Sequence, residues 1–192
     1  GEALEMAKIA ETSGCGLTFC HQRRYHHGNL AVRGIVEEGL FGEIKRMDVY
    51  SPCDLLDCGT HSFDQVASFN RETPARWVHG AVDLSEVGEH YGIPSESMFT
   101  GLVVYENDVR AYIQSKGPDR DMGTGVRIEG TRGLIEVGWN GQTGQAVLYD
   151  DPSWRPPDLA TDEDKSHVMK DVYRDTLDRL EDGQEPLLSY KK

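Results

Sequence analysis

SMFTGLVVYENDVRAYIQS, residues 97–115, predicts a β-hairpin near the middle of the chain. Two strand-like runs, Ser97–Tyr105 and Val109–Ser115, flank the dipeptide Asn107-Asp108. Asn and Asp are favoured in tight hairpin turns because their short polar side chains tolerate left-handed backbone conformations. We therefore expect two neighbouring antiparallel strands here.

The regions on either side of this hairpin differ in their hydrophobic period, and the change falls at Pro74. Before Pro74 helical spacing dominates, and after it apolar residues recur with the period of two that is typical of strands. Further strands are predicted at Ala75–Val82, Val126–Glu129, Leu134–Val137 and Gln145–Tyr149, and earlier ones at Gly16–Cys20 and Glu43–Ser51. Helices are predicted at Glu2–Ser13, at Leu30–Glu38 with Asn29 as N-cap, at Thr60–Phe69 with Thr60 as N-cap, and at Lys165–Glu181.

This order of elements predicts an α+β fold, with a large, mostly antiparallel sheet and helices on one face. The other face of such a sheet is open and available for subunit pairing. We therefore expect a homo-oligomer, either a dimer or a dimer of dimers. The candidate apolar positions of the sheet are Leu102, Val104, Ala111, Ile113, Ile135 and Val137.

Composition and charge exclude several classes of function. The 192 residues include 20 Lys and Arg against 33 Asp and Glu, a formal net charge of −13. Nucleic acids and anionic membranes both need a basic surface, so neither is an expected partner. The sequence has neither a long apolar run nor a signal peptide pattern, and its four cysteines are too few for a disulfide scaffold. We expect a cytoplasmic protein. Because the chain starts Gly-Glu-Ala-Leu-Glu within a predicted helix, we also expect a fragment or a processed form.

The segment with the most chemically active side chains is DLLDCGTHSFD, residues 54–64. If a helix starts near Thr60, Asp57 lies just before it and His61 lies in its first turn, so both can face one cleft. A histidine suits general acid–base chemistry at neutral pH, and a nearby carboxylate can orient it or hold a substrate hydroxyl. The alternative is that His61 caps the helix or packs locally, and that the acids are solvated.

A cationic and aromatic run, Arg23–His27, follows the predicted strand Gly16–Cys20. Strand ends are common ligand sites in α/β architectures, and such a cluster could hold an anionic or polyhydroxyl ligand. The alternative is a set of salt bridges with the many acidic residues.

The spacing of the cysteines argues against a metal site. Cys15 and Cys20, like Cys53 and Cys58, are separated by four residues, unlike the two-residue spacing of zinc ribbons. The pair Cys58 and His61 leaves a zinc site open as an alternative, but we predict none. The chain also lacks a G-x-G-x-x-G fingerprint, so we predict no cofactor-binding residues in it.

Several motifs, taken in order, resemble those of the Gfo/Idh/MocA oxidoreductases. Residues 16–25 and the turn GLFGEI, 39–44, resemble the junction that follows the nucleotide-binding domain of that family. Residues 57–64 are similar to its D-x-G-x-H-x-x-D stretch, and residues 128–135 to its I-x-G-T-x-G hairpin. GQEP, residues 183–186, resembles its closing segment. The resemblance covers nearly the whole chain.

The resemblance implies a function and a set of site residues. Members bind NAD or NADP in a Rossmann domain and oxidise or reduce hydroxyl and carbonyl groups of sugars, inositols and related polyols. The resemblance assigns proton transfer to His61 and substrate holding to Asp57. It also suggests Arg24, Tyr25 and Asp64 as substrate-binding residues.

Departures from the family pattern define the domain organisation that we expect. Neither the Rossmann fingerprint nor an E-K-P segment occurs, and the loop before Asp57 is short. We therefore interpret residues 1–21 as the end of a nucleotide-binding domain, and residues 22–192 as an α+β domain for substrate binding and oligomerisation. By itself the chain should neither bind NAD tightly nor turn over. The alternative is a non-catalytic binding or oligomerisation module that kept the fold.

Overall fold

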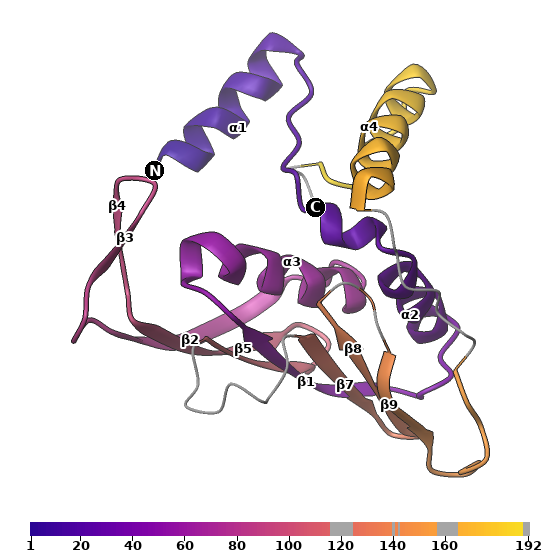
Figure 1. Ribbon diagram of the computed structural model, residues 1–192. Coiled ribbons are helices and arrows are strands. Elements are labelled where there is room, and N and C mark those ends of the chain that lie inside the picture. The colour runs from indigo at the N-terminus through magenta and orange to yellow at the C-terminus, as the bar shows by residue number, and fades with distance from the viewer. Residues whose placement is uncertain (116–124, 140, 142, 157–164, 190–192) are drawn as a thin grey trace.

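The computed structural model of the chain describes residues 1–115, 125–139, 141, 143–156 and 165–189. Its helices lie above one large sheet (Figure 1). The helical elements are α1 (Glu2–Ser13), the 3-10 helix η1 (Gln22–Tyr25), α2 (His27–Glu37), the π-helical turn η2 (Leu55–Gly59), α3 (Thr60–Phe69) and α4 (Lys165–Glu181). The strands are β1 (Ile44–Ser51), β2 (Ala75–Asp83), β3 (Gly88–His90), β4 (Ile93–Ser95), β5 (Met98–Tyr105), β6 (Arg110–Ser115), β7 (Gly125–Gly130), β8 (Gly133–Gly138) and β9 (Thr143–Leu148).

The sheet is mostly antiparallel, which confirms the predicted α+β class. Its seven strands run in the order β2-β5-β6-β1-β7-β8-β9. Every neighbouring pair is antiparallel except β1 and β6, which are parallel. The predicted hairpin forms β5 and β6, with Leu102 opposite Tyr112 and Val103 opposite Ala111. The strands β3 and β4 form a separate two-stranded hairpin, too short for sequence periodicity to reveal.

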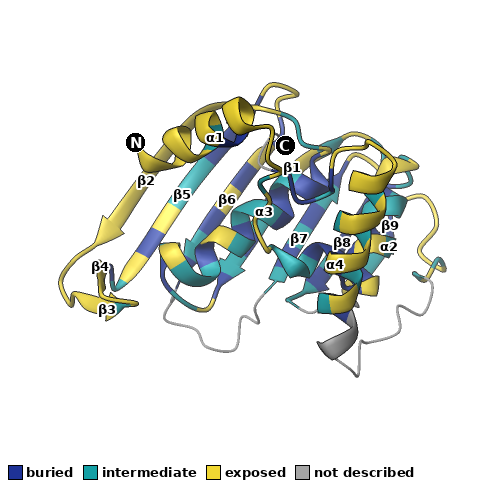
Figure 2. Ribbon diagram, turned by 90° about the horizontal axis from the view of Figure 1, so that it is seen from above, coloured by how far each residue is buried: buried dark blue, intermediate teal, exposed yellow. Residues whose placement is uncertain are grey.

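The hydrophobic core lies between the sheet and the helices α2 and α3, where Figure 2 shows the buried positions of the central strands. Alternation along the strands sends one set of side chains to this core and the next to the opposite face. Of the predicted apolar positions, Ala111, Ile113, Ile135 and Val137 belong to the core. Leu102 and Val104 flank the core residue Val103 and therefore face the other way.

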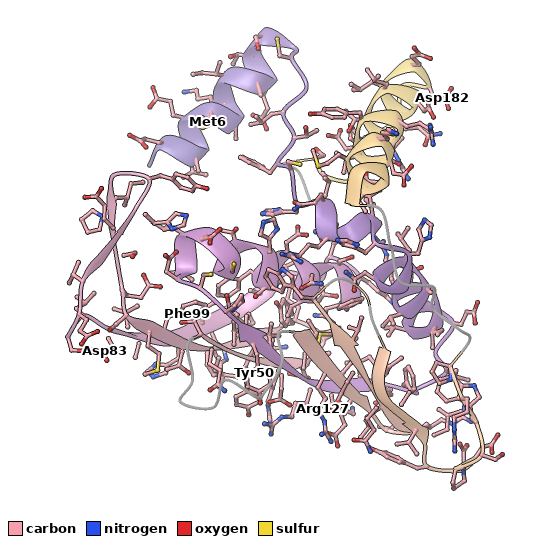
Figure 3. All side chains as sticks on the ribbon, viewed as in Figure 1. Met6, Tyr50, Asp83, Phe99, Arg127 and Asp182 are labelled. Carbon is pink, nitrogen blue, oxygen red and sulfur yellow. The ribbon has the colours of Figure 1, made fainter. Side chains whose placement is uncertain are left out.

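We call the face away from the helices the open face. Tyr50 and Arg127 project from it, as Figure 3 shows. It also carries Trp77 and Tyr112, whose exposed fractions are 48% and 36%. The guanidinium carbon of Arg46 lies 4.3 Å from the Tyr112 ring centroid. This face is therefore amphipathic, with aromatic rings among charged groups.

The helix predicted from Leu30 begins three residues earlier, and a π-helical turn precedes the helix that starts at Thr60 as predicted. The helix predicted from Leu30 starts at His27, and the Asn29 amide donates 2.8 Å to the Arg23 carbonyl instead of capping. Before α3, helical turns already start at Leu55, where the Asp54 carboxylate accepts the backbone N–H of Asp57 at 2.9 Å. Asp54, not Thr60, is therefore the residue that caps this segment.

The predicted strand Gly16–Cys20 is wrong. Only Thr18 forms a β-bridge, to Ser189, and the Phe19 amide donates to the Leu188 carbonyl at 3.1 Å. The apolar pattern of this segment predicts a strand, but the described residues offer it no neighbouring strand along its length. Helix α1 has the predicted bounds, with Gly14 in the left-handed conformation at its end.

Helix α1 lies above the β2–β5 end of the sheet (Figures 1 and 2), and most of its side chains are exposed. Ala10 is its one buried residue, while Leu4, Met6 and Ile9 are exposed. None of the helices among the described residues has the length and apolar character that a membrane crossing requires.

Candidate functional site

His61 lies in the first turn of α3, within a group of aromatic rings. Its ring makes edge-on contacts with His21, at 5.3 Å between centroids, and with Trp139, at 6.0 Å. Its Nδ1 is buried and has no hydrogen-bond partner among the described residues. The imidazole is therefore held by packing against these rings, since among the described residues no carboxylate forms a hydrogen bond with it.

The surroundings of His61 keep its imidazole neutral. Burial lowers the pKa of His61, and the nearby charges of Arg23 and His21 lower it further. The carboxylates Asp64 and Asp57 act in the opposite direction but are outweighed. A half-buried, neutral imidazole can accept a proton at pH 7.

Arg23 packs on the ring of Trp139, the aromatic residue of this group that follows β8. The Arg23 guanidinium lies 3.4 Å from the Trp139 ring centroid, and its Nη1 donates 3.0 Å to the Trp139 carbonyl. Burial lowers the pKa of Arg23 to about 10, against the raising effect of Cys58 and Asp57. A Cβ on Gly28 would lie only 1.7 Å from the Gly141 carbonyl oxygen, so the turn after Trp139 sits directly against the start of α2.

Asp57 lies in η2, four residues before His61, and is half-buried. Its Oδ2 is 3.5 Å from the Cys58 Sγ and 3.9 Å from the His90 Nε2. Among the described residues no hydrogen bond joins Asp57 to His61. The charge of Asp57 nevertheless acts on both His61 and Arg23, so it belongs to the same electrostatic environment.

Arg24 and Asp64 form the centre of a buried ion-pair network. Arg24 donates to both Asp64 oxygens at 2.8 Å and to Glu72 at 2.5 Å. His21 Nδ1 lies 3.1 Å from Asp64 Oδ1. Burial alone would raise the pKa of Asp64, but the hydrogen bonds from His21 and Arg24 hold it below its usual value. Asp64 thus orients His21, the ring that contacts His61.

Tyr25 is directed toward α4. Its hydroxyl donates 2.7 Å to Asp175, and its ring packs in a small core with Val168, Val172 and Leu188. Burial, with the Asp175 contact, raises the pKa of Tyr25. Of the five predicted site residues, the structure therefore groups His61 and Asp57 near Arg23, links Arg24 and Asp64 in one network, and ties Tyr25 to α4.

His21 and Trp139 are site residues that sequence reasoning missed. His21 directly precedes the cationic run and could have been included with it. Trp139 comes from the turn after β8, and nothing in the local sequence links it to a residue 78 positions earlier.

One group of described residues could hold a metal. A sulfur or oxygen atom from each of Cys53, Asp57 and Cys58 lies within 4.8 Å of the others. Burial, with the neighbouring Cys53 and Asp57, raises the pKa of Cys58 to about 12. Cys15 and Cys20 are exposed elsewhere on the chain.

Solved structures share this fold, at low sequence identity. No family model matches the chain, and no curated protein sequence does. An oxidoreductase from Agrobacterium radiobacter, in complex with NAD+, L-tartaric acid and magnesium, superposes with a TM-score of 0.69 at 18% identity over 97% of this chain and 61% of its own. The WlbA dehydrogenase from Bordetella pertussis, in complex with NADH and UDP-GlcNAcA, has a TM-score of 0.72 at 14% identity, over 97% of this chain and 61% of its own. An NAD-binding oxidoreductase from Klebsiella pneumoniae has a TM-score of 0.74 at 13% identity, over 98% of this chain and 63% of its own.

This chain thus spans less than two thirds of each of these proteins. At sequence identities this low, the similarity shows a shared fold and not a shared activity. The chain has a fold found within NAD-binding oxidoreductases, which confirms, at the level of fold, the resemblance that its motifs indicate.

Proposed function

We propose that this chain is the substrate-binding and assembly part of an NAD(P)-dependent oxidoreductase of the Gfo/Idh/MocA type. Its substrate would be a sugar, inositol or related polyol, oxidised at a hydroxyl or reduced at a carbonyl. The neutral, half-buried His61 at the start of α3 carries the proposal, because it is suited to move the proton of a hydroxyl. The shared fold supports it.

The residues present fit the substrate side of such a reaction. A nicotinamide, held by a separate nucleotide-binding domain, supplies the hydride chemistry. In the oxidation direction His61 takes the hydroxyl proton, and in the reduction direction it returns it. Asp57 is proposed to hold a substrate hydroxyl, and the charge of Arg23 keeps the imidazole neutral between turnovers.

For Arg24, Tyr25 and Asp64 we propose a role behind the substrate surface. Their polar atoms already bond to Glu72, Asp175 and each other. Arg24 and Asp64 would position His21, and through its ring His61, while Tyr25 would tie η1 to α4.

The domain boundary near residue 21 is also part of this proposal. Helix α1 exposes Leu4, Met6 and Ile9 to solvent. Exposed apolar side chains on one short helix are expected where another domain covers them. Residues 1–21 would accordingly pack against the nucleotide-binding domain.

The protein that contains this chain together with its nucleotide-binding domain tests the proposal directly. With NAD+ or NADP+ and a panel of sugars, inositols and polyols, we expect reduced nicotinamide to form with at least one substrate. Residues 1–192 alone should give no turnover. Dehydrogenase activity from residues 1–192 alone would contradict the proposal that turnover needs a separate nucleotide-binding domain. Binding of NAD(H) without turnover of any polyol would favour the non-catalytic module instead.

We further propose that the open face pairs subunits into a dimer or a dimer of dimers. Light scattering at micromolar concentration should show an oligomer. Trp77→Ala and Tyr112→Ala should each weaken it, by roughly 2 kcal/mol or about 30-fold if the ring is a hot spot. Val78→Ala is the matched control, because Val78 neighbours Trp77 on β2, is 63% exposed and faces the other way. A wild-type monomer would exclude this interface.

A further inference from the structure

Three potential metal ligands meet around the start of η2, and a fourth lies beside them at the end of β3. Cys53, Asp57 and Cys58 place one ligand atom each within 4.8 Å of one another. His90, at the end of β3, brings its Nε2 to 3.9 Å from Asp57 Oδ2. The ligands thus come from two segments that lie more than thirty residues apart.

Within the described part of the chain, His90 has a ring nitrogen without a hydrogen-bond partner on the side that faces Asp57. Its Nε2 is buried and has no hydrogen-bond partner among the described residues. Its Nδ1 lies 3.6 Å from Asp54 Oδ2. A proton on Nδ1, facing that carboxylate, leaves the Nε2 lone pair directed at Asp57. Carboxylate–histidine–metal arrangements have this form.

The spacing of the Cys53, Asp57 and Cys58 atoms is compatible with a tetrahedral zinc ion. Zinc–sulfur bonds of about 2.3 Å and zinc–nitrogen or zinc–oxygen bonds of about 2.0 Å imply ligand separations of roughly 3.3–3.8 Å. The observed 3.5 Å from Cys58 Sγ to Asp57 Oδ2 lies in that range, whereas the 3.9 Å from His90 Nε2 to Asp57 Oδ2 would have to shorten as His90 moves onto the ion. Two thiolates with an imidazole and one carboxylate favour zinc over magnesium or calcium.

Further contacts already hold η2 and the β3–β4 hairpin next to each other. Asp54 uses Oδ1 to accept the Asp57 amide and directs Oδ2 to His90. The carboxylate of Glu96, just after β4, accepts the Leu55 amide at 2.6 Å. One end of the hairpin is therefore already fastened to the start of η2.

We propose that Cys53, Asp57, Cys58 and His90 form a structural zinc site that fastens the β3–β4 hairpin to η2. Four protein ligands close the coordination sphere, which is typical of structural and not catalytic zinc. On binding, the two thiols release their protons to solvent, and no redox step is involved. The site uses only Oδ2 of Asp57 and needs no substrate, so it does not depend on the proposed oxidoreductase function.

Metal titration of the reduced chain, residues 1–192, tests the site. We expect one equivalent of zinc by elemental analysis after dialysis. Cobalt as a substitute should give thiolate charge-transfer bands and the visible bands of a tetrahedral ion. Cys53→Ser and Cys58→Ser should weaken those charge-transfer bands, and His90→Ala should lower zinc affinity at least about tenfold. Asp54→Asn, which keeps a capping oxygen, should lower it about 10- to 100-fold.

Cys15→Ser and Cys20→Ser are the matched controls, since both thiols are exposed and lie outside the cluster. They should bind zinc like the wild type. The proposal is wrong if the reduced wild-type chain retains no stoichiometric zinc. It is equally wrong if Cys53→Ser and Cys58→Ser leave the cobalt spectrum unchanged. Circular dichroism identifies any variant that fails to fold, and the wild-type titration decides the question without variants.

Discussion

If the proposed function is right, His61→Ala should lower kcat of the proposed full-length oxidoreductase by about 10²- to 10⁴-fold, the usual contribution of a positioned acid–base group. The substitution removes the imidazole to which the proposed mechanism assigns the substrate proton, and leaves the ion-pair network of Arg24 with Asp64 in place. Binding of the nicotinamide cofactor should be unchanged. Steady-state kinetics with the best substrate of the panel measure the effect. Unchanged turnover would remove His61 from the mechanism.

The pH profile separates a proton-transfer role from a structural one. Burial, Arg23 and His21 all lower the pKa of His61, so its neutral form persists below pH 6.5. In the oxidation direction kcat/KM should fall on the acid side, with an inflection below 6.5. Arg23→Gln removes one lowering charge and should move that inflection upward. Arg33→Gln, whose partner is the surface residue Glu37, should not move it.

Sequence periodicity predicted the sheet because burial on one face imposes alternation. Ala111 and Ile113 on β6, with Ile135 and Val137 on β8, are core residues whose neighbours face away, and a register shifted by one residue would expose them. The bounds of α1, α3 and α4 also agree with the prediction. Such local patterns are set by the nearest neighbours in the chain.

The partners of charged side chains were not predictable in this way. Tyr25 and Asp175 are 150 residues apart, and Arg24 selects Asp64 and Glu72 from 33 acidic residues. Periodicity carries no information on which opposite charges meet. The residues expected to face substrate were chosen by motif alone, and the structure shows Arg24, Tyr25 and Asp64 bonded to internal partners.

Arg24→Ala is expected to destabilise the chain by about 3–5 kcal/mol, the cost of leaving buried charges without their partner. The side chains of Arg24 and Asp64 are only 6% and 9% exposed, and Glu72 completes the network at 20%. Urea unfolding of residues 1–192, wild type against variant, measures the difference in the free energy of unfolding. Arg174→Ala is the matched control: its pair with Asp171 is on the surface, with Arg174 69% exposed, and its loss should cost less than about 1 kcal/mol.

Acid titration of stability gives a second, independent measure of this network. Because the pKa of Asp64 is lowered in the folded chain, its contribution is fully present above its unfolded value of about 3.9. That contribution is lost as the pH falls through the lower folded value. His21 and Arg24 together hold the pKa of Asp64 down, so Arg24→Ala should lose less stability than the wild type over that interval. If instead the variant unfolds at the same urea concentration as the wild type at pH 7, Arg24 is free to contact substrate, and its role behind the site is wrong.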